Sequence, residues 1–373
     1  FGTVEAAPDA QAVDGSLWST AGTPGDARLL GAGVGVTHGG RLLGRRVLFF
    51  AVREERGEWV LRLWRSEGTA AGTEVVAEIE RLPAWFPHGG HGSPPEIHDI
   101  AIAGDRLHFL SLGALWRSDG TTAGTTRVED PCGGACDTIR ELAAVGDTLY
   151  FAAREETSNG IRETLWRSDG SPEGSHALAV LLDVTFEDWS ARSGAPGIAR
   201  LTPAGSRLFF LGDDGRHGAE LWVSDGTEAG TRMVRDLRPG PAGSHPTWLT
   251  AHGDGVFFAA DGGLRGQELW SSDGSGRGTR LVRDIAPGAV SSYPQELAVV
   301  GGRLVFAAFH PTHGLEAWQS DGTAAGTRLL ADVLPGPGSS APRSFTLAGG
   351  TLFFVSGRPR LGYELWAIGG AGE

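Results

Sequence analysis

A leucine–tryptophan pair that returns about every 48 residues constrains the fold of this chain more than any other feature. The pair occurs eight times in 373 residues, once as Ala-Trp, and successive copies are 46 to 56 residues apart. A period of this length indicates one supersecondary unit per repeat, and it is too long for leucine-rich or ankyrin repeats. The tryptophans of the eight copies are Trp18, Trp64, Trp116, Trp166, Trp222, Trp270, Trp318 and Trp366.

Each repeat contains four short apolar segments, which we call strands A to D. In the copy over residues 246–288 we expect them at 248–251, 256–260, 268–271 and 279–283. These segments are rich in Val, Leu, Phe and Trp and are bounded by Gly, Asp or Pro. No segment has a helical period long enough for a crossover helix. Four antiparallel strands repeated radially leave few exposed sheet edges, so the sequence predicts an all-β fold, a β-propeller.

The number of complete repeats predicts seven blades. There are eight Trp-bearing C strands but only seven B strands and seven D strands. The pair Leu17-Trp18 is therefore surplus, and we expect the D strand near Arg28 to close the last blade. An eight-bladed ring is the alternative, but it lacks strands to complete a blade. The predicted organisation is an N-terminal segment at 1–22, one propeller domain at 23–367 and a C-terminal tail at 368–373.

The links between strands C and D repeat a Ser-Asp-Gly-Thr motif. Its Asp can accept hydrogen bonds from turn N–H groups, and its Gly permits a positive φ. One acidic residue per loop is too few for a calcium shell, so we predict structural turns and no cofactor, with calcium as the alternative. The turn aspartates are Asp119, Asp169, Asp225, Asp273 and Asp321.

The repeated motif resembles that of a known family. ELWxSDGTxxGT, followed by VxDIxPGxxGSxPxxL and LFFxAxDGxxGxELW, is similar to the ELWxxDGT-repeat proteins, which are secreted proteins of bacteria, frequent among myxobacteria. The match covers almost the whole chain, is very specific in the last four units and is degraded in the first three. The resemblance implies propeller architecture and export, and it supplies no established catalytic residues.

Charge and cysteine usage bound the partners and the compartment. A net charge of −13 argues against nucleic acid or an anionic membrane as a partner, and no apolar run is long enough to insert into a bilayer. Cys132 and Cys136 are separated by Gly-Gly-Ala, which favours a local disulfide and an oxidising compartment. The start at Phe1 fits a mature protein after signal-peptide removal. We therefore expect a secreted, cell-surface or periplasmic bacterial protein.

The candidate binding residues lie in loops that depart from the repeat. In a propeller the B–C and D–A loops share one face, and variable loops on a rigid scaffold often carry binding sites. Flat aromatic rings beside acidic groups suit a sugar, whereas the alternative is that these rings anchor long loops. His88, His91 and His98 are weak candidates for a metal site. The predicted ligand-binding residues are Trp59, Trp85, Trp189, Trp248, His88, His91 and Asp188.

The function expected from these features is binding without catalysis. The sequence contains no GxSxG, HExxH or P-loop motif. Acid–base sets such as Asp213, His217 and Glu220 recur from unit to unit, which indicates a structural role because an active site needs one copy. We expect an exported, non-enzymatic module that binds a polysaccharide or a surface protein on the B–C/D–A face. The alternatives are a glycan lyase or hydrolase, and a structural subunit of a surface assembly.

Overall fold

The computed structural model describes residues 17–19, 28–31, 36–83, 95–191, 197–358 and 361–369. In this part the chain forms six four-stranded sheets, one three-stranded sheet, one two-stranded sheet and a single short helix. It divides into two compact units, which are described separately. Unit 1 comprises residues 1–154 and 166–176, and unit 2 comprises residues 155–165 and 177–373.

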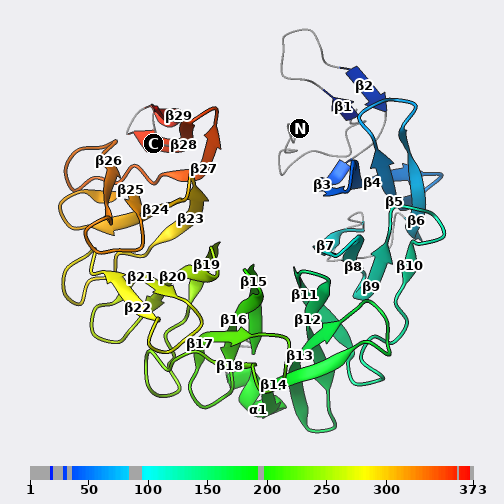
Figure 1. Cartoon of the computed structure of the whole chain (residues 1–373), viewed down its shortest axis with the longest axis horizontal. Helices are drawn as coiled ribbons and strands as arrows, with labels where there is room; N and C mark the ends of the chain where they lie inside the picture. Colours follow the sequence, from blue (N-terminus) through cyan, green and yellow to red (C-terminus); the bar gives the residue numbers. More distant parts are fainter. Residues whose placement is uncertain are drawn as a thin grey trace. The chain divides into compact units, whose positions relative to one another are not determined.

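Unit 1 holds the two-stranded sheet, two complete sheets and part of a third (Figure 1). The pair consists of β1 (Leu17–Ser19) and β2 (Arg28–Gly31). The first complete sheet consists of β3 (Val36–Leu43), β4 (Arg46–Glu55), β5 (Glu58–Ser66) and β6 (Thr73–Pro83). The second consists of β7 (Ile97–Ala103), β8 (Arg106–Ser111), β9 (Ala114–Ser118) and β10 (Thr126–Arg127). The next sheet, divided between the units, consists of β11 (Thr138–Val145), β12 (Thr148–Glu156), β13 (Gly160–Ser168) and β14 (His176–Thr185).

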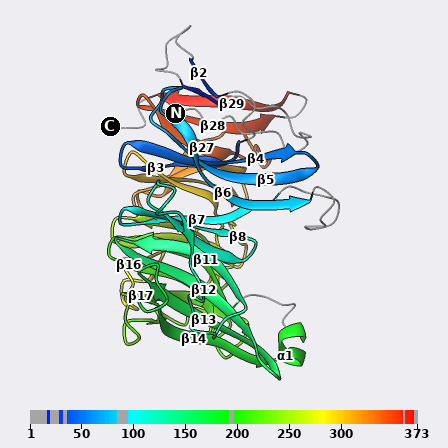
Figure 2. The same ribbon diagram turned by 90° about the vertical axis from the view of Figure 1, so that its right-hand side faces the viewer.

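Unit 2 continues with α1 (Phe186–Ala191), which lies at the end of β14 in Figure 2. Its first complete sheet consists of β15 (Ile198–Ala204), β16 (Arg207–Asp213), β17 (Ala219–Ser224) and β18 (Arg232–Met233). The second consists of β19 (Thr247–His252), β20 (Gly255–Asp261), β21 (Gln267–Ser272) and β22 (Arg280–Arg283). The third consists of β23 (Gln295–Val300), β24 (Arg303–His310), β25 (Gly314–Ser320) and β26 (Arg328–Ala331). The last has three strands, β27 (Arg343–Ala348), β28 (Thr351–Arg358) and β29 (Gly362–Gly369).

Neighbouring sheets bury each other's middle strands. In unit 2, Phe209 and Leu221 of one sheet form a single apolar cluster with Phe258 of the next, and all three are fully buried. A strand covered on both faces needs a continuous apolar run, and the second strands have one. Strand order within each four-stranded sheet follows the chain, with antiparallel pairing. This arrangement, together with the structural comparisons below, confirms the predicted seven-bladed propeller.

The recurring tryptophans occupy equivalent places, as the repeat predicted. Six of them stand opposite a phenylalanine of the second strand, as Trp116 does opposite Phe109 and Trp270 opposite Phe258. The rings of Phe109 and Trp116 are stacked with centroids 6.1 Å apart. The period of the sequence is therefore a period of cross-strand aromatic pairs.

Closure of the last blade by the strand near Arg28 stays a prediction, as do the domain boundaries. In the structure β2 pairs with β1, with Leu29 opposite Trp18, and the sheet of β27–β29 has three strands among the described residues. Leu365 on β29 is 70% exposed, whereas its counterparts Leu221 and Leu269 are 0% exposed. The difference follows from the position of β29 as the last strand of its sheet.

We predict that Leu269→Ala lowers the free energy of unfolding by about 2–5 kcal/mol, because it opens a cavity between packed sheets. Leu365→Ala, at the same position of the repeat, should cost less than about 0.5 kcal/mol, because the side chain is exposed. Urea unfolding followed by far-ultraviolet circular dichroism measures both. Equal costs would contradict the exposure of β29 and would instead favour the predicted closure of the last blade.

Candidate functional site

The Ser-Asp-Gly-Thr turns use their carboxylates internally. Asp119 Oδ1 accepts hydrogen bonds from Thr121 N at 2.9 Å and from Thr121 Oγ1 at 2.6 Å. These bonds to the charged form lower the pKa of Asp119 below its usual range. Gly120 follows with φ +81°, a conformation that favours glycine. The same pattern recurs at Asp169, Asp225, Asp273 and Asp321.

No group of three or more His, Cys, Asp or Glu side chains in the described part of the chain is arranged to hold a metal ion. His98 is exposed on β7, while His88 and His91 lie outside the described residues. The metal and calcium hypotheses therefore remain predictions from the sequence.

A buried glutamate anchors the loop after each of three sheets in unit 2. Glu268, fully buried in β21, accepts hydrogen bonds from Ser292 Oγ at 2.6 Å and from the backbone N of Ile285 at 2.9 Å. The N–H groups of Ala286 and Ser292 also point to this carboxyl. Glu220 binds Ser244 and Glu316 binds Ser340 in the same way, always 24 residues apart. We call this arrangement the Glu–Ser clasp.

The clasp explains why acidic residues recur in the repeat. Burial raises the pKa of Glu268 to about 7, against the opposing effect of its hydrogen bonds. Its oxygens are taken up by the loop of residues 284–294, so it acts in holding that loop. The sequence carries a signal for this pairing, because the Glu two positions before the recurring Trp and the Ser two positions before a loop Pro are 24 residues apart in all three copies. No single motif contains both residues, so the signal is visible only when distant segments of the repeat are compared.

We expect Glu268→Ala to lower the free energy of unfolding by about 1–3 kcal/mol, because buried N–H donors lose their acceptor. Glu364, the matching residue of β29, is exposed, so Glu364→Ala provides the control and should leave stability nearly unchanged. Thermal unfolding by calorimetry would measure the two variants side by side. Wild-type stability in Glu268→Ala would show that the clasp does not hold the loop.

His108 is a buried titratable group that the sequence analysis missed. It lies on β8 with 1% exposure, and neither ring nitrogen has a hydrogen-bond partner. A Cβ placed on Gly170 would stand 2.6 Å from His108 Nε2, so the imidazole packs beneath that glycine. Leu48 lies beneath Gly120 in the corresponding way. In another sheet of unit 1, the position equivalent to His108 is therefore occupied by an apolar side chain, Leu48.

The imidazole of His108 stays neutral near physiological pH. Burial lowers its pKa to about 4, and Arg106 and Arg117 add to the effect. The side chain lines a hollow of about 590 Å³ together with Asp105 and Asp147. Burying two unpartnered nitrogens costs stability, which makes His108 an exception to the packing of the repeat.

We predict that His108→Leu stabilises unit 1 at pH 7 by about 1–2 kcal/mol. The substitution should also remove the part of the pH dependence of folding stability that His108 causes. The folded pKa of about 4 lies below the unfolded value of about 6.5, so the unfolded state binds a proton first and wild-type stability falls as the pH drops from 6.5 to 4. Urea unfolding at pH 4.5 and 7.5 compares the two proteins. An unchanged pH dependence in the variant contradicts this account.

The predicted ligand-binding residues are described only in part. Trp59 lies on β5 opposite Leu82, and Trp189 belongs to α1. Thr185 caps α1, because its Oγ1 accepts a hydrogen bond from the backbone N of Asp188 at 3.1 Å and donates one to the Asp188 carboxylate at 2.8 Å. Trp248 is exposed on β19, and Trp85 lies outside the described residues. Their role in ligand binding stays a prediction.

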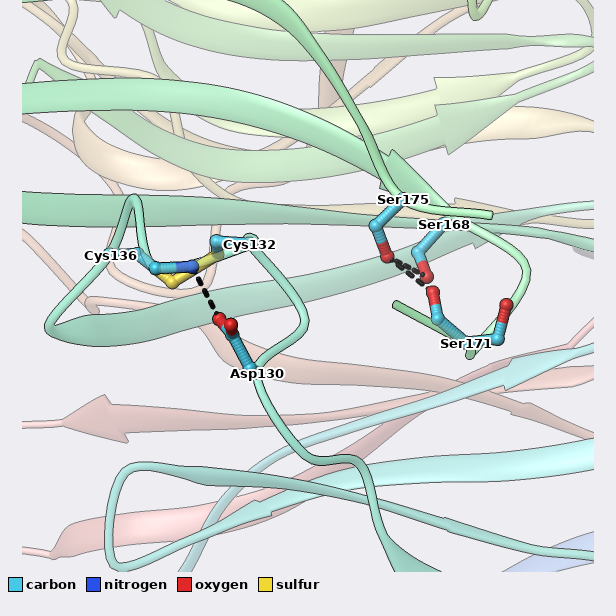
Figure 3. The surroundings of a disulfide bond; sticks show 7 residues. Asp130, Cys132, Cys136, Ser168, Ser171 and Ser175 are labelled. Atoms are coloured by element: carbon cyan, nitrogen blue, oxygen red, sulfur yellow. Dashed lines mark hydrogen bonds between the residues drawn. A yellow bond between two sulfur atoms is a disulfide. The ribbon is translucent and has the colours of Figure 1, made fainter. Parts of the chain in front are cut away.

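The predicted disulfide is confirmed. Cys132 and Cys136 are joined, with their Cα atoms 5.8 Å apart. The loop between them turns through Gly133 and Gly134, both at positive φ. The Gly134 N–H donates to Asp130 Oδ1 at 2.6 Å, and Figure 3 shows Asp130 beside the disulfide. The bridge thus closes a turn that already has its own hydrogen bonds.

Comparisons with known proteins bear on the fold. No model of a protein family and no curated protein matches the sequence. Among solved structures, a prolyl endopeptidase aligns with 90% of this chain and 50% of its own, at 15% identity and a TM-score of 0.51. Prolyl oligopeptidase B from Galerina marginata aligns at 12% identity and a TM-score of 0.50, over 90% of this chain and 49% of its own. Oligopeptidase B from Leishmania major aligns at 14% identity and a TM-score of 0.49, over 89% of this chain and 46% of its own.

These comparisons correct the expected function. The chain spans about half the length of the structures it resembles, and those proteins are named as peptidases. The expectation of a non-enzymatic module for a polysaccharide or a surface protein is therefore wrong, because the matching architecture occurs as part of enzymes. At this level of identity the likeness establishes the propeller fold alone.

Proposed function

We propose that the chain serves as the propeller of a peptidase-type protein, in which it receives and holds oligopeptides. The observation that carries the proposal is the match of 90% of the chain to half of a prolyl endopeptidase structure. In such a protein the propeller would act as a scaffold, and its exposed loops and first strands would be the parts available to a substrate.

The use of the buried acids supports a holding role. The carboxylates of Glu220, Glu268 and Glu316 are occupied by loop donors. The turn aspartates are occupied by their own turns. Groups committed to structural hydrogen bonds are poor candidates for general acid–base chemistry, which needs a carboxyl within reach of the substrate.

The Cys132–Cys136 bridge supports a location in an oxidising compartment, which we propose on this ground. Export also fits the resemblance drawn from the repeat. The exclusion of nucleic acid and of membrane insertion stays a prediction; the described part of the chain contains no helix that could span a bilayer.

We expect the isolated chain to bind peptides without cleaving them. A pool of fluorescein-labelled hexapeptides should give a saturable rise in fluorescence anisotropy. We expect a Kd in the micromolar range, which corresponds to a binding free energy of about −8 kcal/mol. Peptide masses should be unchanged after incubation. A matched pool of labelled oligosaccharides is the control. Binding of the oligosaccharides in place of the peptides, or of neither pool, overturns the proposal.

A further inference from the structure

Four exposed apolar side chains gather on two adjacent sheets of unit 2. Trp248 is 40% exposed, Leu264 86%, Val290 46% and Tyr293 60%. We call these four residues the aromatic strip. Trp248 lies on β19, Leu264 in the loop that joins β20 to β21, and the other two in the loop that leads to β23. Large apolar side chains exposed as a group, rather than singly, mark a contact surface.

Hydrogen bonds connect the segments that carry the strip. The loop before β23 packs on the loop before β21, because Gln267 N donates to Ser291 Oγ at 2.9 Å and Tyr293 N donates to Gln267 O at 3.3 Å. The strands β19 and β23 lie side by side (Figure 1). The hydroxyl of Thr250 lies within hydrogen-bond distance of the carbonyl oxygens of both Trp248 and Leu297. The strip therefore runs across one continuous part of unit 2.

Both aromatic residues of the strip adopt a backbone conformation that favours glycine. Trp248 has φ +57° and Tyr293 has φ +46°. The geometry recurs in the following sheet, where Ser344 stands at φ +58° and Ala341 at φ +47°. The left-handed conformation is thus a property of the repeat, whereas the residue type at that position varies from sheet to sheet. An exposed aromatic side chain gains little from folding at such a position, which is consistent with a contact made outside the fold.

Two arginines beside the strip are each paired with a carboxylate. Arg238 pairs with Asp261, and Arg265 pairs with Asp284 at 2.7 Å. Because these arginines are paired, they offer little attraction to a charged ligand, and the exposed apolar area favours an uncharged group. The two exposed aromatic rings suit an apolar or aromatic side chain, which would gain dispersion energy and bury apolar area against them.

We propose that the aromatic strip binds an apolar side chain of an extended oligopeptide and so selects among peptides. This inference rests on the proposed function, because that function supplies the peptide. Trp248 and Tyr293 form the two walls that hold the side chain, and Leu264 and Val290 extend the apolar surface along the peptide. An acidic residue at the same place in the peptide would make no such apolar contact, and its carboxylate would lose hydrating water on binding, which costs free energy.

The test compares glycine substitutions at four left-handed positions. Trp248→Gly and Tyr293→Gly remove the aromatic walls, while Ser344→Gly and Ala341→Gly are matched controls at the equivalent positions of the next sheet. All four should keep or raise the thermal midpoint of unfolding, because glycine relieves the left-handed strain. The probe is a labelled hexapeptide with a central Phe, with its Glu counterpart as a second ligand.

The wild-type chain should bind the Phe peptide at least tenfold more tightly than the Glu peptide. Trp248→Gly and Tyr293→Gly should each weaken the Phe peptide about tenfold, and the two controls should stay within about twofold. If both aromatic variants bind the Phe peptide with wild-type affinity, the aromatic strip is not the binding site for that side chain, and the proposed function is unaffected. If the wild-type chain binds no peptide, the proposed function itself fails, and the strip fails with it.

Discussion

Burial of every central strand on both faces is the constraint on which the rest of the structure depends. Phe209, Leu221 and Phe258 show it: residues of two sheets share one apolar cluster, and each is fully covered. Most side chains in such strands are committed to packing, and His108 is an exception in that it lines a hollow. Chemistry is thereby confined to loops, turns and the first strand of each sheet. The aromatic strip occupies two of these places, a first strand and the loops beside it.

The repeat supplied the fold class because its cause is local. Leu269 and Trp270 alternate between the two faces of one strand, and turn residues flank that strand at fixed distances. Such signals are readable within a few residues of sequence. The Glu–Ser clasp was less accessible, because Glu268 and Ser292 are far apart along the chain and belong to different segments of the repeat.

The candidate site was less predictable than the fold, for a different reason. Trp248 was identified by its departure from the tryptophan spacing, but Tyr293 was not, because nothing in side-chain pattern reveals a left-handed backbone. Trp248, Glu296 and Ser344 share that conformation and have no chemistry in common. His108 was missed because a histidine within an apolar strand reads as part of the run. Trp85, His88 and His91 lie outside the described residues, so their part of the prediction stays open.

Repetition provides a way to separate structural residues from functional ones. A residue that recurs at one position in several blades, such as the turn aspartates or the clasp glutamates, meets a structural need that those blades share. A residue that departs from its equivalents at a cost to folding answers a need of one place only. Solved peptidases share this fold with the chain at 12–15% identity, so the common backbone alone does not encode a shared specificity. Under the function proposed above, specificity would reside in the departures, and Trp248 and Tyr293 are departures that face solvent.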